Sequence, residues 1–167
     1  MKALQLLAVI STALLLGTTF APVLEMPSEL AMSGDSWSMV QRTVHRSLLA
    51  VGGPLENFTI VINLAVLAAA LSRPQLLLLT GGSTLSLMLA FAIWVAFTQP
   101  VHLQVLAWND GAVPVDWQRW RDQWEFSQLI RFLLHLTGLL LLAASLLNLA
   151  LDEDPESQLA PGWADRR

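Results

Sequence analysis

The stretch WQRWRDQWEFSQLIRFLLHLTGLLLLAASLLNLAL, Trp117–Leu151, decides the fold. Its second part, Phe132–Leu151, contains no aspartate, glutamate, lysine or arginine, and about 20 such residues form a helix that crosses the hydrocarbon of a bilayer. Its first part is rich in tryptophan and arginine, which are typical of the boundary between lipid and water. Asp116 is well placed to cap a helix that begins at Trp117. We therefore expect one helix to run from this boundary into the membrane.

Three further segments of the chain are similarly apolar: Ala3–Leu24, roughly Asn57–Ser72, and Gln75–Gln99. In lipid the backbone polar groups must pair within a helix, so the sequence predicts membrane helices at about 3–24, 54–72, 75–98 and 127–151. The composition agrees, because 54% of the residues are hydrophobic and only 13% are charged, whereas soluble domains have about 25% charged residues. The predicted fold class is all-α, an integral membrane four-helix bundle whose partner is the lipid bilayer.

The second and third apolar segments are separated only by a short turn, Ser72–Pro74. Such a turn forces an antiparallel hairpin, with Pro74 opening the next helix. Small residues at a spacing of four let neighbouring membrane helices approach closely. They recur on both of these predicted helices, as Ala65 and Ala69 on one and as Gly82, Ser86 and Ala90 on the other.

An amphipathic helix is predicted at about 36–51, between the first and second membrane helices. Apolar residues recur there at spacings of three and four, opposite a polar face, and Asp35 or Ser36 can cap its start. This helix either lies in the membrane interface or extends the second membrane helix outward. The glycine pair before Pro54 favours a bend between the two.

The side of the membrane on which each connection lies follows from the number of helices. The two long connections share one side, and both termini share the other side with Arg73. Lys2 and Arg73 lie closest to helix ends, which favours cytoplasmic termini of a multi-pass protein in the cell membrane. The first segment could instead be a signal peptide, but it exceeds the usual apolar core of about 7–15 residues, so we expect a retained helix. The acidic tail, 152–167, is expected to be disordered.

Polar residues on the last helix fall on one face rather than being scattered. Tryptophans and outer arginines fit anchoring at the membrane boundary. Arg131 and His135 are too deep for anchoring alone, and ionisable groups at such depth usually face a bundle interior or a wet cavity. Two adjacent rows form this face, Trp117–Trp124–Arg131–Gly138 and Arg121–Gln128–His135–Leu142, with Glu125 beside them and able to pair with Arg121.

Arg131 needs a counter-charge, since an unpaired buried charge costs several kcal/mol. Glu25 follows the first apolar segment and Glu56 begins the second, so either carboxylate could neutralise it. The sequence predicts a polar pocket at the mouth of the bundle on the side of the long connections, floored by Arg131 and His135.

Several function classes are disfavoured. The net charge is −4 and Lys2 is the only lysine, so no basic surface exists for nucleic acid. The chain has no cysteine, which excludes disulfides and thiolate metal sites. The histidines His45, His102 and His135 are a weak signal for a metal or haem, and we expect no metal and no cofactor. One deep arginine gives little support to a transporter.

Two blocks of this chain resemble a known family. The first is LEMPSELAMSGDSWSMVQ, Leu24–Gln41, with Glu-x-Pro at the end of the first helix and a tryptophan and a glutamine after it. The second runs from PVHLQVLAW to PVDWQRWRDQWEFSQLIR, Pro100–Arg131. Its pattern is similar to a tryptophan, then Pro-x-x-Trp, then Trp-Glu-x-x-His-x-x-Arg. The blocks resemble the small four-helix membrane proteins labelled domain of unknown function 1772, which include fungal anthrone oxygenases. The resemblance covers nearly the whole chain from Glu25, through short motifs.

The resemblance implies which residues matter and where this chain departs. The matching positions are Glu25, Pro27, Gln41, Trp108, Trp117, Trp124, Glu125 and Arg131. Gln128 stands where the family often has histidine, His102 where it often has asparagine, and Glu29 where it often has lysine. These positions are chemically capable, so the departures bear on any shared catalytic activity and leave the architecture untouched.

Two functions are compatible with these observations. The first is a non-enzymatic bundle that binds a lipid, a small apolar molecule or a partner subunit. The second, which the resemblance implies, is a metal-independent membrane oxygenase for a hydrophobic aromatic substrate, in which a carboxylate or His135 removes a proton and an arginine stabilises the enolate. The catalytic candidates are His135, Arg131 and Glu25. The predicted binding residues are Glu25, Gln41, Trp108, Trp117, Trp124, Glu125, Gln128, Arg131 and His135.

Overall fold

A computed structural model describes residues 2–108 and 113–152, with side chains up to residue 149. Within these ranges the chain is helical and contains no strand. The elements in chain order are α1 (Lys2–Leu30), α2 (Gly34–Val40), the π-helical turn η1 (Gln41–His45), α3 (Arg46–Ala69), α4 (Pro74–Ile93), the π-helical turn η2 (Trp94–Thr98), α5 (Gln99–Ala107) and α6 (Trp117–Asp152).

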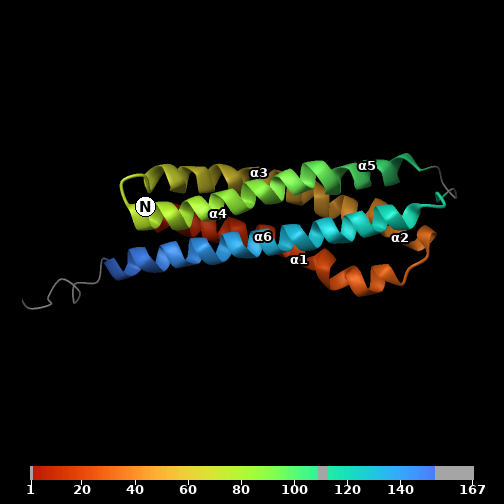
Figure 1. Ribbon diagram of the computed structural model, residues 1–167, viewed down its shortest axis with the longest axis horizontal. Coiled ribbons are helices and arrows are strands. Elements are labelled where there is room, and N and C mark those ends of the chain that lie inside the picture. The colour runs from red at the N-terminus through yellow and green to blue at the C-terminus, as the bar shows by residue number, and fades with distance from the viewer. Residues whose placement is uncertain (1, 109–112, 153–167) are drawn as a thin grey trace, which may run out of the picture.

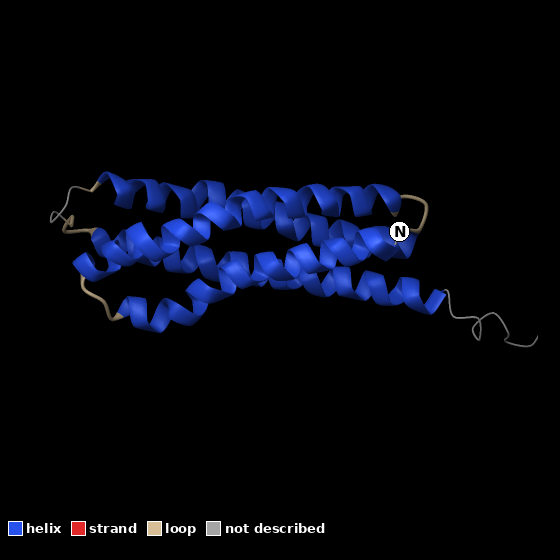
Figure 2. Ribbon diagram, turned by 180° about the vertical axis from the view of Figure 1, so that it is seen from behind, coloured by secondary structure: helices blue, strands red, loops and turns tan. Residues whose placement is uncertain are grey.

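These elements form four long rods that lie side by side and alternate in direction (Figures 1 and 2). The turn η1 joins α2 to α3, and η2 joins α4 to α5, so each group is one continuous helix. The start of α1, the end of α6 and the turn before α4 lie at one end of the bundle (Figure 1). The described residues contain four helices long and apolar enough to cross a membrane. The predicted all-helical fold with four such helices is confirmed to that extent.

The first two helices are longer than predicted. α1 continues past residue 24 to Leu30, through Pro22 and Pro27. Its last turns diverge from the direction of its first part in both ribbon views (Figures 1 and 2), as expected where proline removes a helical hydrogen bond. This extension brings a second glutamate, Glu29, onto the same helix as Glu25.

The glycines and proline at Gly52–Pro54 do not interrupt the helix, because α3 passes through Pro54. The amphipathic segment therefore extends the second rod outward and is not a separate interfacial helix. Gly52 faces α1, and a Cβ there would make an ordinary contact at 3.6 Å with Oγ1 of Thr18. The amphipathic segment also begins two residues earlier than predicted, at Gly34. Its N-cap is Ser33, whose Oγ accepts a hydrogen bond from the backbone N–H of Ser36.

The fourth rod begins at Trp117 and runs unbroken to the end of the described chain, as the sequence predicts. The third rod, α4 with η2 and α5, likewise extends beyond the predicted 75–98 to Ala107. The expected turn at residues 109–111 and the expected disordered tail, from residue 153 onward, lie outside the described residues.

The packing faces are only partly as predicted. Ser86 and Ala90 are buried, and a Cβ on Gly82 would lie 3.0 Å from Cδ1 of Leu141, so these small residues pack α4 against α6. Ala65 and Ala69 are exposed, so the predicted role for this pair is wrong. Alanines at a spacing of four mark a face, and only the tertiary packing shows which face is covered.

The bundle has a polar interior and an apolar surface. Leu78, Leu85 and Leu147 are more than half exposed, whereas polar side chains join the rods inside. Gln5 on α1 donates to Ser145 on α6 at 3.3 Å. Asn63 on α3 accepts a hydrogen bond from Ser83 on α4 at 3.2 Å and donates one to Thr12 on α1 at 3.4 Å. Soluble proteins have the opposite arrangement, so the surface is suited to a lipid environment.

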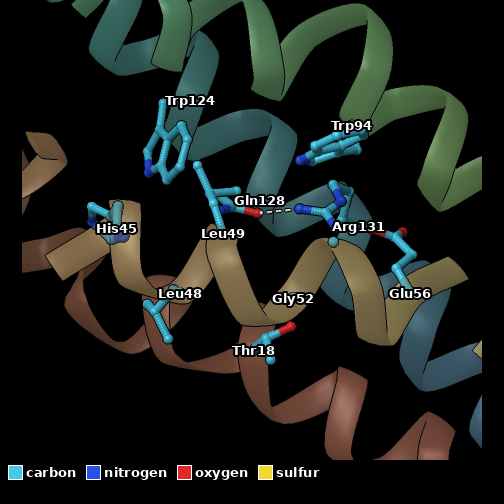
Figure 3. A pocket seen from close by; sticks show the side chains of 11 residues that line it. Thr18, His45, Leu48, Leu49, Gly52, Glu56, Trp94, Trp124, Gln128 and Arg131 are labelled. Atoms are coloured by element: carbon cyan, nitrogen blue, oxygen red, sulfur yellow. Dashed lines mark hydrogen bonds and ion pairs between the residues drawn. The ribbon is translucent and has the colours of Figure 1, made fainter. Parts of the chain in front are cut away.

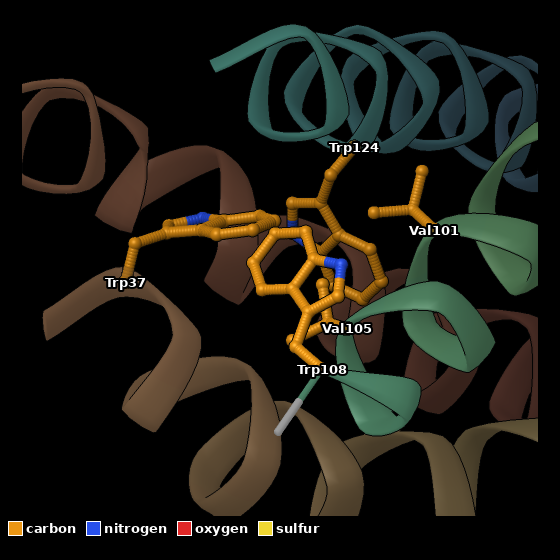
Figure 4. Packing of buried hydrophobic residues seen from close by; sticks show 5 residues of the cluster. All are labelled: Trp37, Val101, Val105, Trp108 and Trp124. Atoms are coloured by element: carbon orange, nitrogen blue, oxygen red, sulfur yellow. The ribbon is translucent and has the colours of Figure 1, made fainter. Parts of the chain in front are cut away.

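Tryptophans close the end of the bundle that carries the long connections (Figure 4). Trp37, Trp108 and Trp124 form a buried cluster with Val101 and Val105, and the rings of Trp37 and Trp108 are 6.1 Å apart. Trp124 is fully buried, so its predicted role as a boundary anchor is wrong. It is one turn further along α6 than Trp120 and two turns further than Trp117, and both of these are only partly buried against the cluster.

Candidate functional site

Arg131 lies buried between α6 and α3, and Glu56 neutralises it. Nη2 of Arg131 donates to Oε2 of Glu56 at 2.8 Å, and Nη1 donates to Oε1 of Gln128 at 3.0 Å. Both charged side chains are at least 95% buried. Of the two counter-charges that the sequence offers, Glu56 is the correct one and Glu25 is not. Figure 3 shows the arginine and the glutamate meeting between the two helices.

His135 lies on the other side of the same glutamate. Its Nε2 is 3.4 Å from Oε1 of Glu56, and its Nδ1 is 3.2 Å from Oγ1 of Thr19 on α1. The hydroxyl of Thr19 also donates to the carbonyl of Leu16 at 3.1 Å, so the direction of its contact with Nδ1 depends on the tautomer of His135. Glu56 thus connects an arginine and a histidine on successive turns of α6. We refer to Glu56, Arg131 and His135 as the paired cluster.

A small open pocket, with a cavity volume of about 20 Å³, borders the paired cluster (Figure 3). Gly52 and Gly53 leave this space open on α3, while the indole rings of Trp94 and Trp124 form apolar walls. The complete lining is Thr18, His45, Leu48, Leu49, Gly52, Gly53, Glu56, Trp94, Trp124, Gln128 and Arg131. The space therefore offers aromatic surfaces and, at one place, a guanidinium with its carboxylate.

A second group of ionisable residues lies closer to the tryptophan cluster. Nε2 of His45 is 2.6 Å from Oε1 of Glu29 and 3.9 Å from Oε2 of Glu25. The indole N–H of Trp37 donates to the other oxygen of Glu29 at 3.0 Å. Glu29 and His45 are fully or almost fully buried, and Glu25 is partly exposed. We refer to Glu25, Glu29, His45 and Glu125 as the carboxylate cluster.

Glu125 joins this cluster from α6, because its carboxyl group interacts with that of Glu29. Among the described residues neither oxygen of Glu125 meets a hydrogen-bond donor, since the carboxyl group beside it is another acceptor. The predicted pairing of Glu125 with Arg121 is wrong. Arg121 donates instead to Asp122 at 3.0 Å and to the carbonyl of Leu30 at 3.0 Å, and it acts on Glu125 only through its charge.

The predicted binding residues fall into three places. Trp124, Gln128 and Arg131 line the pocket. Glu25 and Glu125 belong to the carboxylate cluster. Trp108 and Trp117 belong to the tryptophan cluster or pack against it, and Gln41 is fully buried one turn before His45. His135 does not line the pocket and reaches it only through Glu56.

The predicted list of binding residues did not include three side chains that line the pocket or belong to the carboxylate cluster: Glu29, His45 and Trp94. A signal for two of them was present. Glu25 and Glu29 are four residues apart, and so are Trp37, Gln41 and His45, which places each set on one helix face. The signal was hidden because the first helix was expected to end at residue 24. Trp94 carries no such pattern, and its place in the pocket wall follows from the π-helical turn η2, which begins at this residue.

No family model, no curated protein and no solved structure matches the chain. The described residues form an all-helical bundle with four helices long and apolar enough to span a membrane. Its pocket combines apolar walls with a few polar groups. Any more specific family assignment rests on the short motifs named above.

Proposed function

We propose that this chain is a multi-pass membrane protein that binds a small, largely apolar molecule in the pocket beside Glu56 and Arg131. Membrane insertion is supported by the four apolar helices and by the exposed leucines around a polar interior. A bilayer satisfies such a surface, whereas water does not. We retain cytoplasmic termini and the cell membrane as part of this proposal.

The observation that carries the ligand proposal is the composition of the pocket wall. Trp94 and Trp124 supply flat apolar surfaces, and Arg131 supplies hydrogen-bond donors within the same space. Apolar walls with a few fixed polar groups are typical of small-molecule sites, and because the cavity of about 20 Å³ holds only about one water molecule, a ligand has to widen it from its open mouth. The expected ligand has an aromatic or otherwise flat apolar body and one oxygen function directed at Arg131.

Native mass spectrometry of the protein, extracted from membranes in mild detergent, tests this proposal. Gly52→Leu fills the pocket from α3, and Ala50→Leu adds the same side chain at an exposed position of that helix. We expect a bound small molecule on the wild type and on Ala50→Leu, and its loss from Gly52→Leu. Equal ligand occupancy in all three proteins, or no ligand on any of them, would contradict the proposal.

A second candidate function is an oxidoreductase that acts on a hydrophobic aromatic substrate with molecular oxygen as the oxidant. The specific observation in its favour is that Glu56 faces the pocket and contacts both Arg131 and His135. In this scheme a carboxylate removes a proton from a carbon next to a carbonyl, and the guanidinium stabilises the resulting enolate. The resemblance to anthrone oxygenases agrees with this chemistry.

Oxygen consumption by the purified protein with an anthrone separates the two candidates. The oxidoreductase proposal predicts oxygen uptake that falls at least a hundredfold in Glu56→Gln, because general-base catalysis contributes about 10²–10⁴-fold. Ligand binding without oxygen uptake would leave the binding function standing and contradict the enzymatic one. Circular dichroism of the variant checks that the bundle remains folded.

A further inference from the structure

We propose that the carboxylate cluster is a binding site for a divalent transition-metal ion, with Glu25, Glu29 and His45 as ligands. This inference goes beyond the proposed function, because it rests on a different set of residues near the tryptophan-lined end of the bundle. The sequence alone does not bring the three ligands together, because both glutamates lie on α1 whereas His45 lies on the second rod.

The geometry of the three side chains suits a metal ion. One carboxylate oxygen of Glu25, one of Glu29 and a ring nitrogen of His45 all lie within 4.8 Å of one another. Metal–oxygen and metal–nitrogen bonds of about 2.0–2.2 Å place neighbouring ligand atoms about 3–3.5 Å apart. The observed separations from Nε2 of His45 are 2.6 Å to Glu29 and 3.9 Å to Glu25. Shifts of a fraction of an ångström would therefore complete the ligand set.

Unpartnered polar atoms around these ligands provide independent support. Glu125 is 97% buried and is directed at Glu29, yet neither of its oxygens has a donor within the described ranges. The buried Nδ1 of His45 and both side-chain polar atoms of Gln41 also lack partners in that part of the chain. Buried polar groups in proteins are almost always hydrogen-bonded, and a cation would satisfy the oxygens among these atoms, which are those of Glu125 and Oε1 of Gln41.

Neighbouring side chains fix the orientation of the proposed ligands Glu29 and His45. The Trp37 indole donates to Oε2 of Glu29, which leaves Oε1 directed at His45. The His45 ring packs against Trp124 at a centroid distance of 4.9 Å. Such contacts fix the orientation of metal ligands and raise affinity.

The proton balance of binding is defined by the same contacts. The proton between Nε2 of His45 and Oε1 of Glu29 must leave so that the nitrogen can coordinate the metal, and it moves to the unpartnered Nδ1 of the ring. The interacting carboxyl groups of Glu29 and Glu125 hold one proton between them, since two adjacent buried carboxylates cannot both be ionised. Binding of the ion releases this proton to solvent.

The ligand chemistry identifies the class of ion. Imidazole and carboxylates without thiolates suit Mn²⁺, Fe²⁺ or Zn²⁺. Calcium and magnesium prefer oxygen ligands alone, so the histidine argues against them. Because His45 also lines the pocket, a metal ion at this cluster would lie beside any molecule that occupies the pocket.

Titration of the chelator-treated, full-length protein with Mn²⁺ tests the site, with electron paramagnetic resonance reporting free and bound ion. Glu25→Gln removes a partly exposed ligand, so this variant should fold normally. Asp35→Asn removes the same charge from an exposed position on α2. We expect one equivalent of Mn²⁺ on the wild type, displacement by Zn²⁺, at least tenfold weaker binding to Glu25→Gln, and unchanged binding to Asp35→Asn.

A wild-type protein without saturable Mn²⁺ binding would overturn the proposal, as would Glu25→Gln binding with the affinity of the wild type. Spectroscopic coupling of the bound Mn²⁺ to an imidazole nitrogen, lost in His45→Asn, identifies the histidine directly. These readouts involve no pocket ligand, so their failure would leave the proposed function intact.

Discussion

The paired cluster and the carboxylate cluster contain similar residues but differ in charge. In each cluster a histidine lies beside a buried glutamate that comes from another rod. In the paired cluster Arg131 supplies a positive charge at 2.8 Å from Glu56. In the carboxylate cluster the described residues place two carboxyl groups beside one histidine and a third beside Glu29, and the nearby Arg121 donates to Asp122 and to the carbonyl of Leu30 instead.

This difference indicates two roles. In the paired cluster the charges of Glu56 and Arg131 neutralise each other within the chain, so this cluster joins α3 to α6 across the bundle and forms one wall of the pocket. A group of buried carboxylates without its own cation must hold a proton or take a cation from outside. The carboxylate cluster is therefore the part of the interior that should respond to ions, and the paired cluster the part whose residues should be needed for folding.

Glu56→Ala should have the largest effect on stability. It leaves Arg131 buried without its counter-charge, which costs about 3–5 kcal/mol. The free energy of unfolding, measured in mixed detergent micelles, should fall by that amount. Loss of less than 1 kcal/mol would show that the pair does not stabilise the bundle.

A double replacement controls for the volume change at the same site. Glu56→Leu combined with Arg131→Met removes both charges and keeps the interior filled. Replacement of a buried ion pair by apolar residues is often neutral or stabilising. We therefore expect the double variant to be more stable than either single variant, whereas additive losses would contradict direct coupling.

Trp37→Phe should have the next largest effect. It removes the indole N–H that donates to Glu29, and hydrogen bonds to charged groups contribute about 1.5–3 kcal/mol. The free energy of unfolding should fall by about that amount, and the affinity for Mn²⁺ should fall as well. Trp120→Phe, at a partly buried position beside the same cluster, is the matched control and should change neither by as much.

Thr19→Val should have a smaller effect. It removes the hydroxyl that contacts Nδ1 of His135 and retains the volume of the side chain. Loss of a neutral hydrogen bond costs about 0.5–1.5 kcal/mol. Unfolding measurements should show this loss only while His135 is present, so that Thr19→Val in a His135→Ala background changes little.

Glu125→Gln should have the smallest effect on the stability of the metal-free protein, within about 0.5 kcal/mol. Glutamine has the shape of a protonated glutamate and can donate to Glu29, so the variant replaces one neutral partner by another. A loss comparable with that of Glu56→Ala would show that Glu125 is ionised and paired, and would remove the contrast between the two clusters.

The main features of the last helix were predictable from the sequence. The row of Trp124, Arg131 and Gly138 and the row of Gln128 and His135 follow from helical spacing, and all of these residues are buried. The need for a counter-charge on Arg131 follows from the cost of burying a charge. The choice between Glu25 and Glu56 depended on how the rods pack, which no local pattern contains.

The carboxylate cluster could not be predicted for a specific reason. The uncharged segment ends before Glu25, so the first helix was expected to end at residue 24, and Glu29 was not placed on it. Likewise, the glycines before Pro54 favoured a bend that separates His45 from the second rod. In the structure Pro27 and Pro54 both lie within helices, because packing against neighbouring rods outweighs the local preference.

Infrared spectroscopy of the metal-free protein at neutral pH tests the contrast between the clusters most directly. The C=O stretching band of a protonated carboxyl group is separate from the bands of carboxylates. We predict that this band is present in the wild type, is lost in Glu125→Gln and on addition of Mn²⁺, and persists in Glu56→Gln and Asp35→Asn. A wild-type spectrum without the band, or a band that Glu125→Gln leaves unchanged, would contradict the account.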